Sequence, residues 1–481
     1  MSSSKTITTT LHEDLADPNA LRTSFILAMS NMYKSEVPLY GTLVDIVSDV
    51  NKATLQSSLD PNILSMRYGD AVGPSSRIDI ERHGAIRLGT PHELRTIRRI
   101  FNIIGLHPVG YYDLAPAGLP MHATCFRPKS KSSLRQNPFR VFTSVLRPEL
   151  IKDAQARSLA MELLSKRNIF TPQLMDLLDE ADIQSGRLTL SQSKVFISEA
   201  METFKWHGTA ASSHQDYMCL KAEHPILADI ACFRSAHINH LTPRTVDIIA
   251  AQNAMEQEGL SVKERIEGPP SRKCPILLRQ TSFLAIEEPI KFATTEPAAA
   301  LSLIQGSHRA RFGEIEERGA AVTPAGRALY DTLLDEAMAA AKTAESISAE
   351  SLDDEVAKAF SKYPDTWEDM RSRDLVYFSY RVKQHQPSVC RGAYTMAQLL
   401  TDGVVEVIPI TYEDFLPLSA AGIFQSNLGN KDAQQLDASP DVAGLEQALG
   451  VKLSDSDELY RSIRDESIQE CARLLGITIE L

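Results

Sequence analysis

The chain has 481 residues, of which 43% are hydrophobic and 23% charged, and its formal net charge is −12 at pH 7. This composition is typical of a globular protein, and the acidic balance argues against nucleic acid as a partner, because phosphate binding needs clustered lysine and arginine. No apolar run reaches the length of a membrane span, so a membrane partner is not expected either.

The six cysteines are scattered, and the two closest, Cys219 and Cys232, stand 13 residues apart. No CxxC pair is present, which disfavours a zinc knuckle or a dithiol redox site. Reduced thiols and the absence of an apolar secretory core at the N-terminus favour a cytoplasmic protein. We expect a small molecule as its partner, and assembly into a homo-oligomer is left open.

The N-terminal third begins with a loose lead over residues 1–20, followed by apolar helical periodicity over residues 21–60. Residues 81–128 then show the pattern strand, helix, strand, strand. In "TPHELRTIRRIFNIIG", Thr90 is expected to cap the helix and Glu93 to complete a capping box. A glycine, Gly105, fits the end of that helix.

A second unit resembles the first in its order of elements. Residues 147–230 are mostly helical, and "HINHLTPRTVDIIAAQNAMEQEGL" then predicts a strand that carries His240, a helix that starts at Thr242 and Pro243, and a stop at Gly259. Because each unit has a histidine on its first strand, the sequence indicates an internal duplication.

The resulting domain division is one catalytic unit over residues 21–475. We expect a first module at about 78–130, a helical insert at about 147–230, a second module at about 231–320, and C-terminal helices with a loop at about 321–481.

The stretch "ERHGAIRLGT" is the most informative one for chemistry. On a strand, side chains alternate between the two faces, so His83 and Arg87 share one face. Arg87 is suited to hold a carboxylate bidentately; the plainer alternative is a surface ion pair with an acid such as Glu81. For the second histidine we favour His240 over His237, because the Thr-Pro pair follows His240 more closely.

Two histidines and one carboxylate form the facial triad of many non-heme iron sites, which leaves positions open for substrate and dioxygen. "RFGEIEERG" offers Glu314 and Glu316 on one strand face, with Glu317 on the other. Glu314 is the preferred ligand and Glu316 the reserve; a solvated glutamate at a sheet edge is the plain alternative for either.

Six longer motifs carry a resemblance to a known family: "RHGAIRLGT", "HPVGYYDL", "HINHLTPRTVDI", "LLRQTSFLAIEEP", "RFGEIEERGAA" and "LPLSAAGIFQSNL". Over roughly residues 20–475 the chain resembles the 2-oxoadipate dioxygenase/decarboxylase (hydroxyglutarate synthase) family of the vicinal oxygen chelate superfamily. The resemblance implies an α+β fold in which two βαβββ modules form an open barrel around a metal, with large helical insertions.

The resemblance also implies an activity and a set of site residues. The activity is the Fe(II)-dependent conversion of 2-oxoadipate and O₂ to D-2-hydroxyglutarate and CO₂ in lysine breakdown. The implied Fe(II) ligands are His83, His240 and Glu314, and Arg87 would hold the far carboxylate of the substrate. The "LPLSAAG" loop would place Leu418 and Ser419 beside the substrate; the family often has valine at the first of these positions, so we expect a tighter pocket.

Two other functions compete with this oxygenase. A metal-dependent lyase or isomerase could use the same ligands without oxygen, since the ligand set alone does not select the reaction. A non-catalytic protein with the same scaffold would leave the three ligands more than about 5 Å apart, against metal–ligand bonds of about 2.0–2.2 Å.

Overall fold

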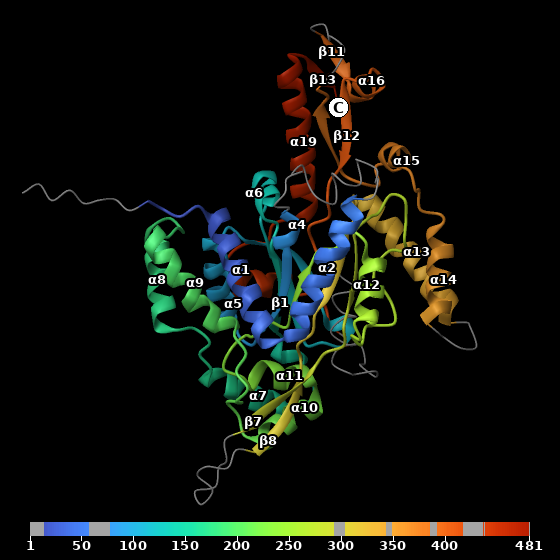
Figure 1. Cartoon of the computed structure of the whole chain (residues 1–481). Helices are drawn as coiled ribbons and strands as arrows, with labels where there is room; N and C mark the ends of the chain where they lie inside the picture. The colour runs from blue at the N-terminus through green and yellow to red at the C-terminus, as the bar shows by residue number, and fades with distance from the viewer. Residues whose placement is uncertain are drawn as a thin grey trace, which may run out of the picture.

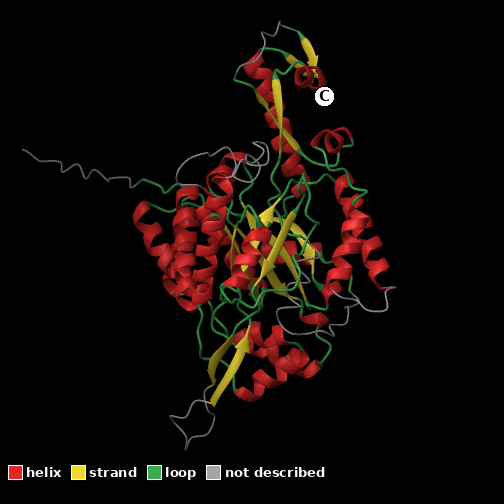
Figure 2. Ribbon diagram, turned by 45° about the vertical axis from the view of Figure 1, so that its right-hand side comes forward, coloured by secondary structure: helices red, strands yellow, loops and turns green. Residues whose placement is uncertain are grey.

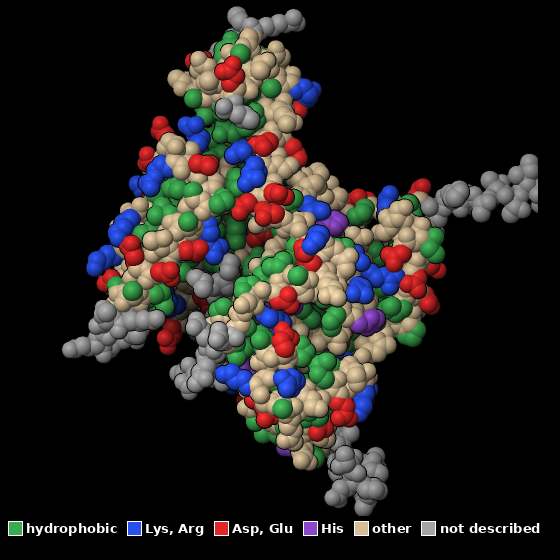
Figure 3. Space-filling view, turned by 180° about the vertical axis from the view of Figure 1, so that it is seen from behind, with side chains coloured by type: hydrophobic (Ala, Val, Ile, Leu, Met, Phe, Trp, Pro, Cys, Tyr) green, Lys and Arg blue, Asp and Glu red, His purple; other side chains and the backbone are tan. Residues whose placement is uncertain are grey.

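The computed structural model describes residues 14–56, 77–292, 304–342, 349–384, 392–416, 436 and 438–480. The fold is mixed α+β: strands occupy the centre and helices surround them (Figures 1 and 2). On the face seen in Figure 3, basic and acidic side chains are interspersed. None of the helices in the described ranges has the length and apolar character that a bilayer span requires.

The first unit is β1 (Arg82–Leu88), α5 (Pro91–Ile103), β2 (His107–Asp113), β3 (Met121–Arg127) and β4 (Arg140–Leu146). Its strands lie in the order β2-β3-β4-β1, with β1 and β4 parallel and the other neighbours antiparallel. The unit therefore extends past the boundary at about residue 130 that the sequence indicated, because its fourth strand was not recognised there.

Local signals explain the limits of α5. The Thr90 hydroxyl accepts a hydrogen bond from the Glu93 N–H, as expected of a helix cap. The expected capping box is wrong: the Glu93 carboxylate accepts from the Gly89 N–H at 2.7 Å and pairs with Arg167. Gly105 ends the helix at φ +72°, a left-handed conformation that glycine adopts without strain.

The second unit consists of β5 (His240–Pro243), α12 (Ile248–Gln257), β6 (Leu278–Ser282) and β9 (Glu314–Arg318). β9 pairs antiparallel with β6 and bridges in parallel to the residue after β5, and residues 262–267 run antiparallel to β6 on its other side. The order β5, β9, β6, 262–267 thus matches the order β1, β4, β3, β2.

The helix of this unit does not start at Thr242 and Pro243, as the sequence indicated. Those two residues pair with β1 as part of β5, and Asp247 caps α12 instead. The end of α12 does match that of α5, since Gly259 also adopts a positive φ, +78°.

The two units meet through their first strands, because β1 pairs antiparallel with β5, with His83 opposite Thr242 and Ala85 opposite His240. The hairpin of β7 (Glu287–Phe292) and β8 (Ile304–Arg309) continues β6 and β9 away from this junction (Figure 1).

The two faces of β1 differ in polarity. Ile86 and Leu88 of β1 pack into the largest apolar cluster, which helices α1 (Pro18–Glu36), α5 and α9 (Leu190–Phe204) share. His83 and Arg87 lie on the other face of the same strand. Burial of apolar side chains thus fixes which face of β1 is polar.

The remaining elements cover the sheet or form an arm beside it. The helical insert contains α7 (Ala154–Lys166), α8 (Pro172–Ile183), α9, α10 (His214–Glu223) and α11 (Pro225–Ala231). Further helices are α2 (Pro38–Gln56), α4 (Arg77–Ile80), α6 (Lys131–Gln136), α13 (Pro324–Lys342), α14 (Ala349–Phe360), α15 (Trp367–Ser372) and α18 (Val442–Leu449), with 3₁₀ turns at Ala115–Ala117 and Pro148–Leu150. The arm at the top of Figure 1 contains β10 (Phe378–Val382), β11 (Ala393–Thr395), α16 (Met396–Thr401), β12 (Val405–Pro409), α19 (Ser456–Leu475) and β13 (Thr478–Glu480).

Candidate metal centre

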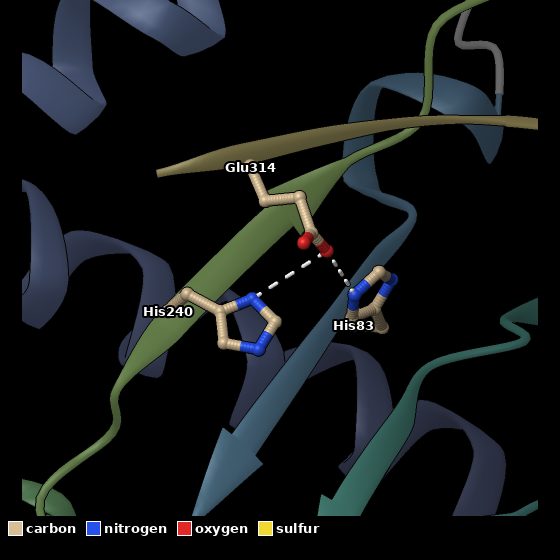
Figure 4. Close-up of side chains that lie close together, drawn as sticks. All are labelled: His83, His240 and Glu314. Atoms are coloured by element: carbon tan, nitrogen blue, oxygen red, sulfur yellow. Dashed lines mark hydrogen bonds and ion pairs between the residues drawn. The ribbon is translucent and has the colours of Figure 1, made fainter. Parts of the chain in front are cut away.

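Three side chains meet where the two units join. His83 comes from β1, His240 from the first residue of β5 and Glu314 from the first residue of β9 (Figure 4). All three are buried, and their candidate ligand atoms lie within 4.8 Å of one another. The antiparallel pairing of β1 with β5, and the position of β9 beside β5, bring these distant parts of the sequence together.

The distances within this cluster are close to those between the ligands of a divalent metal, and the longer one would have to shorten by a few tenths of an ångström on binding. Nε2 of His83 lies 3.0 Å from Oε1 of Glu314, and Nδ1 of His240 lies 3.7 Å from the same oxygen. Two ligands that are each about 2.1 Å from one ion lie about 3.0–3.4 Å apart in octahedral or tetrahedral geometry. Two imidazoles and one carboxylate leave further positions open for other ligands.

The protonation states also suit metal binding. Burial lowers the pKa of His240 to about 3, so its ring is neutral at pH 7. Burial alone would raise the pKa of the Glu314 carboxyl, but His240 and His83 outweigh burial and the pKa lies below its ordinary value. His240 and Glu314 therefore offer deprotonated donors, which is the form a metal binds.

A tyrosine holds the two strands that carry His240 and Glu314. The buried Tyr33 hydroxyl lies 2.9 Å from the carbonyl oxygen of Asn239 and 2.8 Å from that of Phe312. The first carbonyl immediately precedes His240, and the second stands two residues before Glu314. Helix α1 thus fixes the backbone on both sides of the cluster.

Glu316, the reserve ligand, faces His83 from another direction. Its Oε2 lies 3.2 Å from Nδ1 of His83, and it accepts hydrogen bonds from both terminal nitrogens of Arg140, at 3.0 and 2.7 Å, and from Nε of Arg318 at 2.8 Å. A carboxylate at Nδ1 orients the ring so that Nε2 faces Glu314. The structure therefore gives the two glutamates different surroundings: Glu314 lies in the cluster of candidate ligands and Glu316 behind it.

Buried charges continue outward from Glu316. Arg318 pairs with Glu81 at 2.9 Å and with Glu413, and Glu81 also pairs with Arg244. Each of these charges is nearly inaccessible to solvent, so each needs a partner. Glu81, the acid named as the alternative partner of Arg87 in a surface ion pair, is itself buried, as is Arg87.

Aromatic rings line the cluster. The Phe415 ring meets the His83 ring edge-on with centroids 4.9 Å apart, and the Arg140 guanidinium lies 4.5 Å from the Phe415 centroid. Phe312 stacks on His240 at 4.7 Å. The expected substrate residues Leu418 and Ser419 lie outside the described residues; they stand three and four positions after Phe415 in the sequence.

Arg87 is buried on the same face of β1 as His83. Its Nη1 lies 2.5 Å from Oδ2 of Asp229, at the end of the helical insert. His237, the alternative to His240, lies in a different cluster, with Asp229 and His308. Strand alternation predicted that Arg87 lies on the face of His83 and Glu316 on the face of Glu314. No local pattern indicated Asp229, because it is 142 residues from Arg87 in the chain.

Comparisons with known proteins identify the family of the chain. A family described as 2-oxoadipate dioxygenase/decarboxylase matches residues 25–427. The chain is 45% identical over 459 residues to the 2-oxoadipate dioxygenase/decarboxylase of Escherichia coli, which covers 94% of this chain and 98% of the relative. The enzyme of that name from Pseudomonas putida is 42% identical over 475 residues, or 96% of this chain and 98% of the relative.

Solved structures give the same result. The hydroxyglutarate synthase of Pseudomonas putida in complex with 2-oxoadipate superposes with a TM-score of 0.84 at 41% identity, covering 96% of this chain and 99% of that one. An uncharacterised Shigella flexneri protein with a DUF1338 domain superposes with a TM-score of 0.81, also at 41% identity, covering 95% and 100%.

Proposed function

Since the chain belongs to the 2-oxoadipate dioxygenase/decarboxylase family, we propose that it is an Fe(II)-dependent oxygenase that converts 2-oxoadipate and O₂ to D-2-hydroxyglutarate and CO₂. We assign this reaction to lysine catabolism in the cytoplasm, where thiols stay reduced; the five cysteines that the structure describes are free.

The observation that carries the proposal is the convergence of His83, His240 and Glu314 in one buried cluster. These three residues would hold the metal. Bound Fe(II) would supply the activation of dioxygen and a template for the 2-oxo acid. A non-catalytic scaffold would have no need to bring three buried donors together at these distances.

The other residues have roles that follow from their chemistry. Arg87 would bind the distal carboxylate and so decide which carbon of the substrate is presented for hydroxylation; a misplacement of about 1 Å can cost about 100-fold in rate. Phe415 and Phe312 keep water away from the reacting groups. Leu418 and Ser419 would contact the substrate from the loop that follows Phe415.

The atoms balance without a further co-substrate. The carboxyl carbon next to the ketone leaves as CO₂, and the ketone carbon becomes the new carboxylate with one oxygen atom from O₂. The second oxygen atom becomes the hydroxyl group on the adjacent carbon. The substrate supplies all the electrons that reduce O₂.

The repeated order of strands supports a vicinal-oxygen-chelate-like architecture for this site. The first unit has the order β, α, β, β, β; the second follows the same order with residues 262–267 in place of its second strand and with the β7–β8 hairpin inserted before its last strand. The candidate ligands come from the first strand of each unit and the last strand of the second. We propose that this duplicated sheet is the open barrel that surrounds the metal.

Oxygen uptake tests the function. Protein loaded with Fe(II) under anaerobic conditions is mixed with 2-oxoadipate and O₂, and the product is identified by mass and by chiral chromatography. One 2-hydroxyglutarate per O₂ consumed is the expected result. Loss of 2-oxoadipate without oxygen would favour the lyase or isomerase. The absence of any reaction despite bound iron would contradict the assignment of 2-oxoadipate as the substrate.

A further inference from the structure

A second buried polar cluster lies beside Arg87 and has no part in the function proposed so far. It contains Asp229 from α11, His237, and His308 from β8, with candidate ligand atoms within 4.8 Å of one another. Two histidines and a carboxylate are the residue types of a metal site. The contacts of Asp229 nevertheless disfavour a metal ion at this cluster.

Both carboxylate oxygens of Asp229 already face hydrogen-bond donors. Oδ1 lies 2.8 Å from Nε2 of His308 and 3.2 Å from Nε2 of His237, and Oδ2 lies 2.5 Å from Nη1 of Arg87. A divalent cation at Asp229 would be placed next to a buried guanidinium, where the repulsion between like charges is only weakly screened. At the first cluster, by contrast, no arginine within the described ranges forms an ion pair with Glu314.

The surroundings of Asp229 hold it in one position. The Tyr217 hydroxyl lies 3.0 Å from Nδ1 of His308, which leaves Nε2 of that ring to face Asp229. Trp206 stacks on His308 with centroids 5.9 Å apart and meets His237 edge-on at 4.7 Å. All of these polar groups are buried, so the carboxylate has a fixed direction toward Arg87.

We propose that Asp229 is a positioning residue that fixes the Arg87 guanidinium for the distal carboxylate of the substrate, and that it thereby sets the preference for dicarboxylic over monocarboxylic 2-oxo acids. The inference rests on the proposed role of Arg87 in the function above. A guanidinium is planar and presents its donors in a rigid fork, so a contact that fixes one nitrogen also fixes the direction of the others. A preordered cation binds its ligand with less loss of conformational freedom.

The test compares two acids of equal chain length, 2-oxoadipate and 2-oxohexanoate, which lacks the distal carboxylate. The value of kcat/KM is measured for each acid by oxygen uptake, and the dissociation constant of each is measured anaerobically. The variants are Asp229→Asn, Arg87→Ala and the double variant, with Asp176→Asn on the exposed face of α8 as the matched control. If Asp229→Asn does not fold, Asp229→Glu takes its place in the comparison, because it keeps the negative charge and moves it by one methylene group.

The loss of kcat/KM is expected for 2-oxoadipate and not for 2-oxohexanoate. Asp229→Asn should lower kcat/KM for 2-oxoadipate about 10- to 100-fold and change that for 2-oxohexanoate by less than about 2-fold. The double variant should be no worse than Arg87→Ala alone, because residues that act as a unit are not additive. Asp176→Asn should match the parent.

Three results would overturn the inference. An equal loss for both acids in Asp229→Asn would mean that Asp229 only supports the fold. A second equivalent of bound metal that is lost in Asp229→Asn would make the cluster a metal site. An Arg87→Ala variant that keeps the preference for 2-oxoadipate would refute the proposed role of Arg87 itself, which distinguishes that failure from a failure of Asp229.

Discussion

Replacing Glu316 by glutamine tests whether Glu316 binds the metal itself or only supports the ligand His83. The change keeps the shape of the side chain but removes a fully buried negative charge that accepts three hydrogen bonds from Arg140 and Arg318. The two arginines then lose their shared counter-charge, and breaking a buried ion pair in this way costs about 3–5 kcal/mol. The His83 ring also loses the carboxylate at Nδ1, which should weaken metal binding about 10- to 100-fold.

Glu314→Gln should behave differently, because it removes a candidate ligand and should abolish specific metal binding. Glu317→Gln is the matched control, since Glu317 is on the same strand and accepts a hydrogen bond from the Ile248 N–H on the other side. The assays are anaerobic titration with Fe(II) or Co(II) and urea unfolding of the metal-free proteins. Tight metal binding by Glu314→Gln together with complete loss in Glu316→Gln would refute the assignment.

Three further outcomes follow from single contacts. His83→Ala should lose bound metal and oxygen uptake together, whereas Arg87→Ala should keep the metal and bind 2-oxoadipate much more weakly; metal analysis and anaerobic titration with the acid check both. Tyr33→Phe should destabilise the fold by about 1–3 kcal/mol, because the buried carbonyl groups of Asn239 and Phe312 lose the one hydroxyl hydrogen that they share. It should also weaken metal binding in the same titration; unchanged stability would contradict the role of Tyr33. Burial, and secondarily Arg87, lower the pKa of His224 to about 4, against about 6.5 in an unfolded chain. The folded protein then binds fewer protons than the unfolded chain between these values, so this stabilisation is complete above about pH 6.5 and is lost as pH falls toward 4. His224→Asn keeps a side chain that can cap α11 and removes the titration, so its urea midpoint should fall less between pH 7 and pH 4.5 than that of the parent.

Strand alternation predicted a large part of the geometry. It placed His83 and Arg87 on one face of β1 and Glu314 and Glu316 on one face of β9, and the structure has both arrangements. Alternation could not distinguish the two glutamates, since that depends on Arg140 and Arg318, which reach Glu316 from other parts of the sheet.

Other features depend on contacts that no local pattern contains. Asp229 reaches Arg87 from the insert, and His308 reaches Asp229 from the hairpin, both far away in the sequence. Glu93 bonds to Gly89 in place of completing a capping box because Arg167 draws its carboxylate to that side. Thr242 and Pro243 remain extended because β1 pairs with them, and tertiary pairing outweighs a local helix signal.

The fate of isotopically labelled dioxygen tests the central claim most directly. The native protein loaded with Fe(II) is given 2-oxoadipate under ¹⁸O₂, and the 2-hydroxyglutarate formed is examined by mass spectrometry. The account predicts that both oxygen atoms of one O₂ molecule enter the product, one in the new carboxylate and one in the hydroxyl group. A product that contains no label from O₂ would contradict the oxygenase and would favour a lyase or isomerase on the same scaffold.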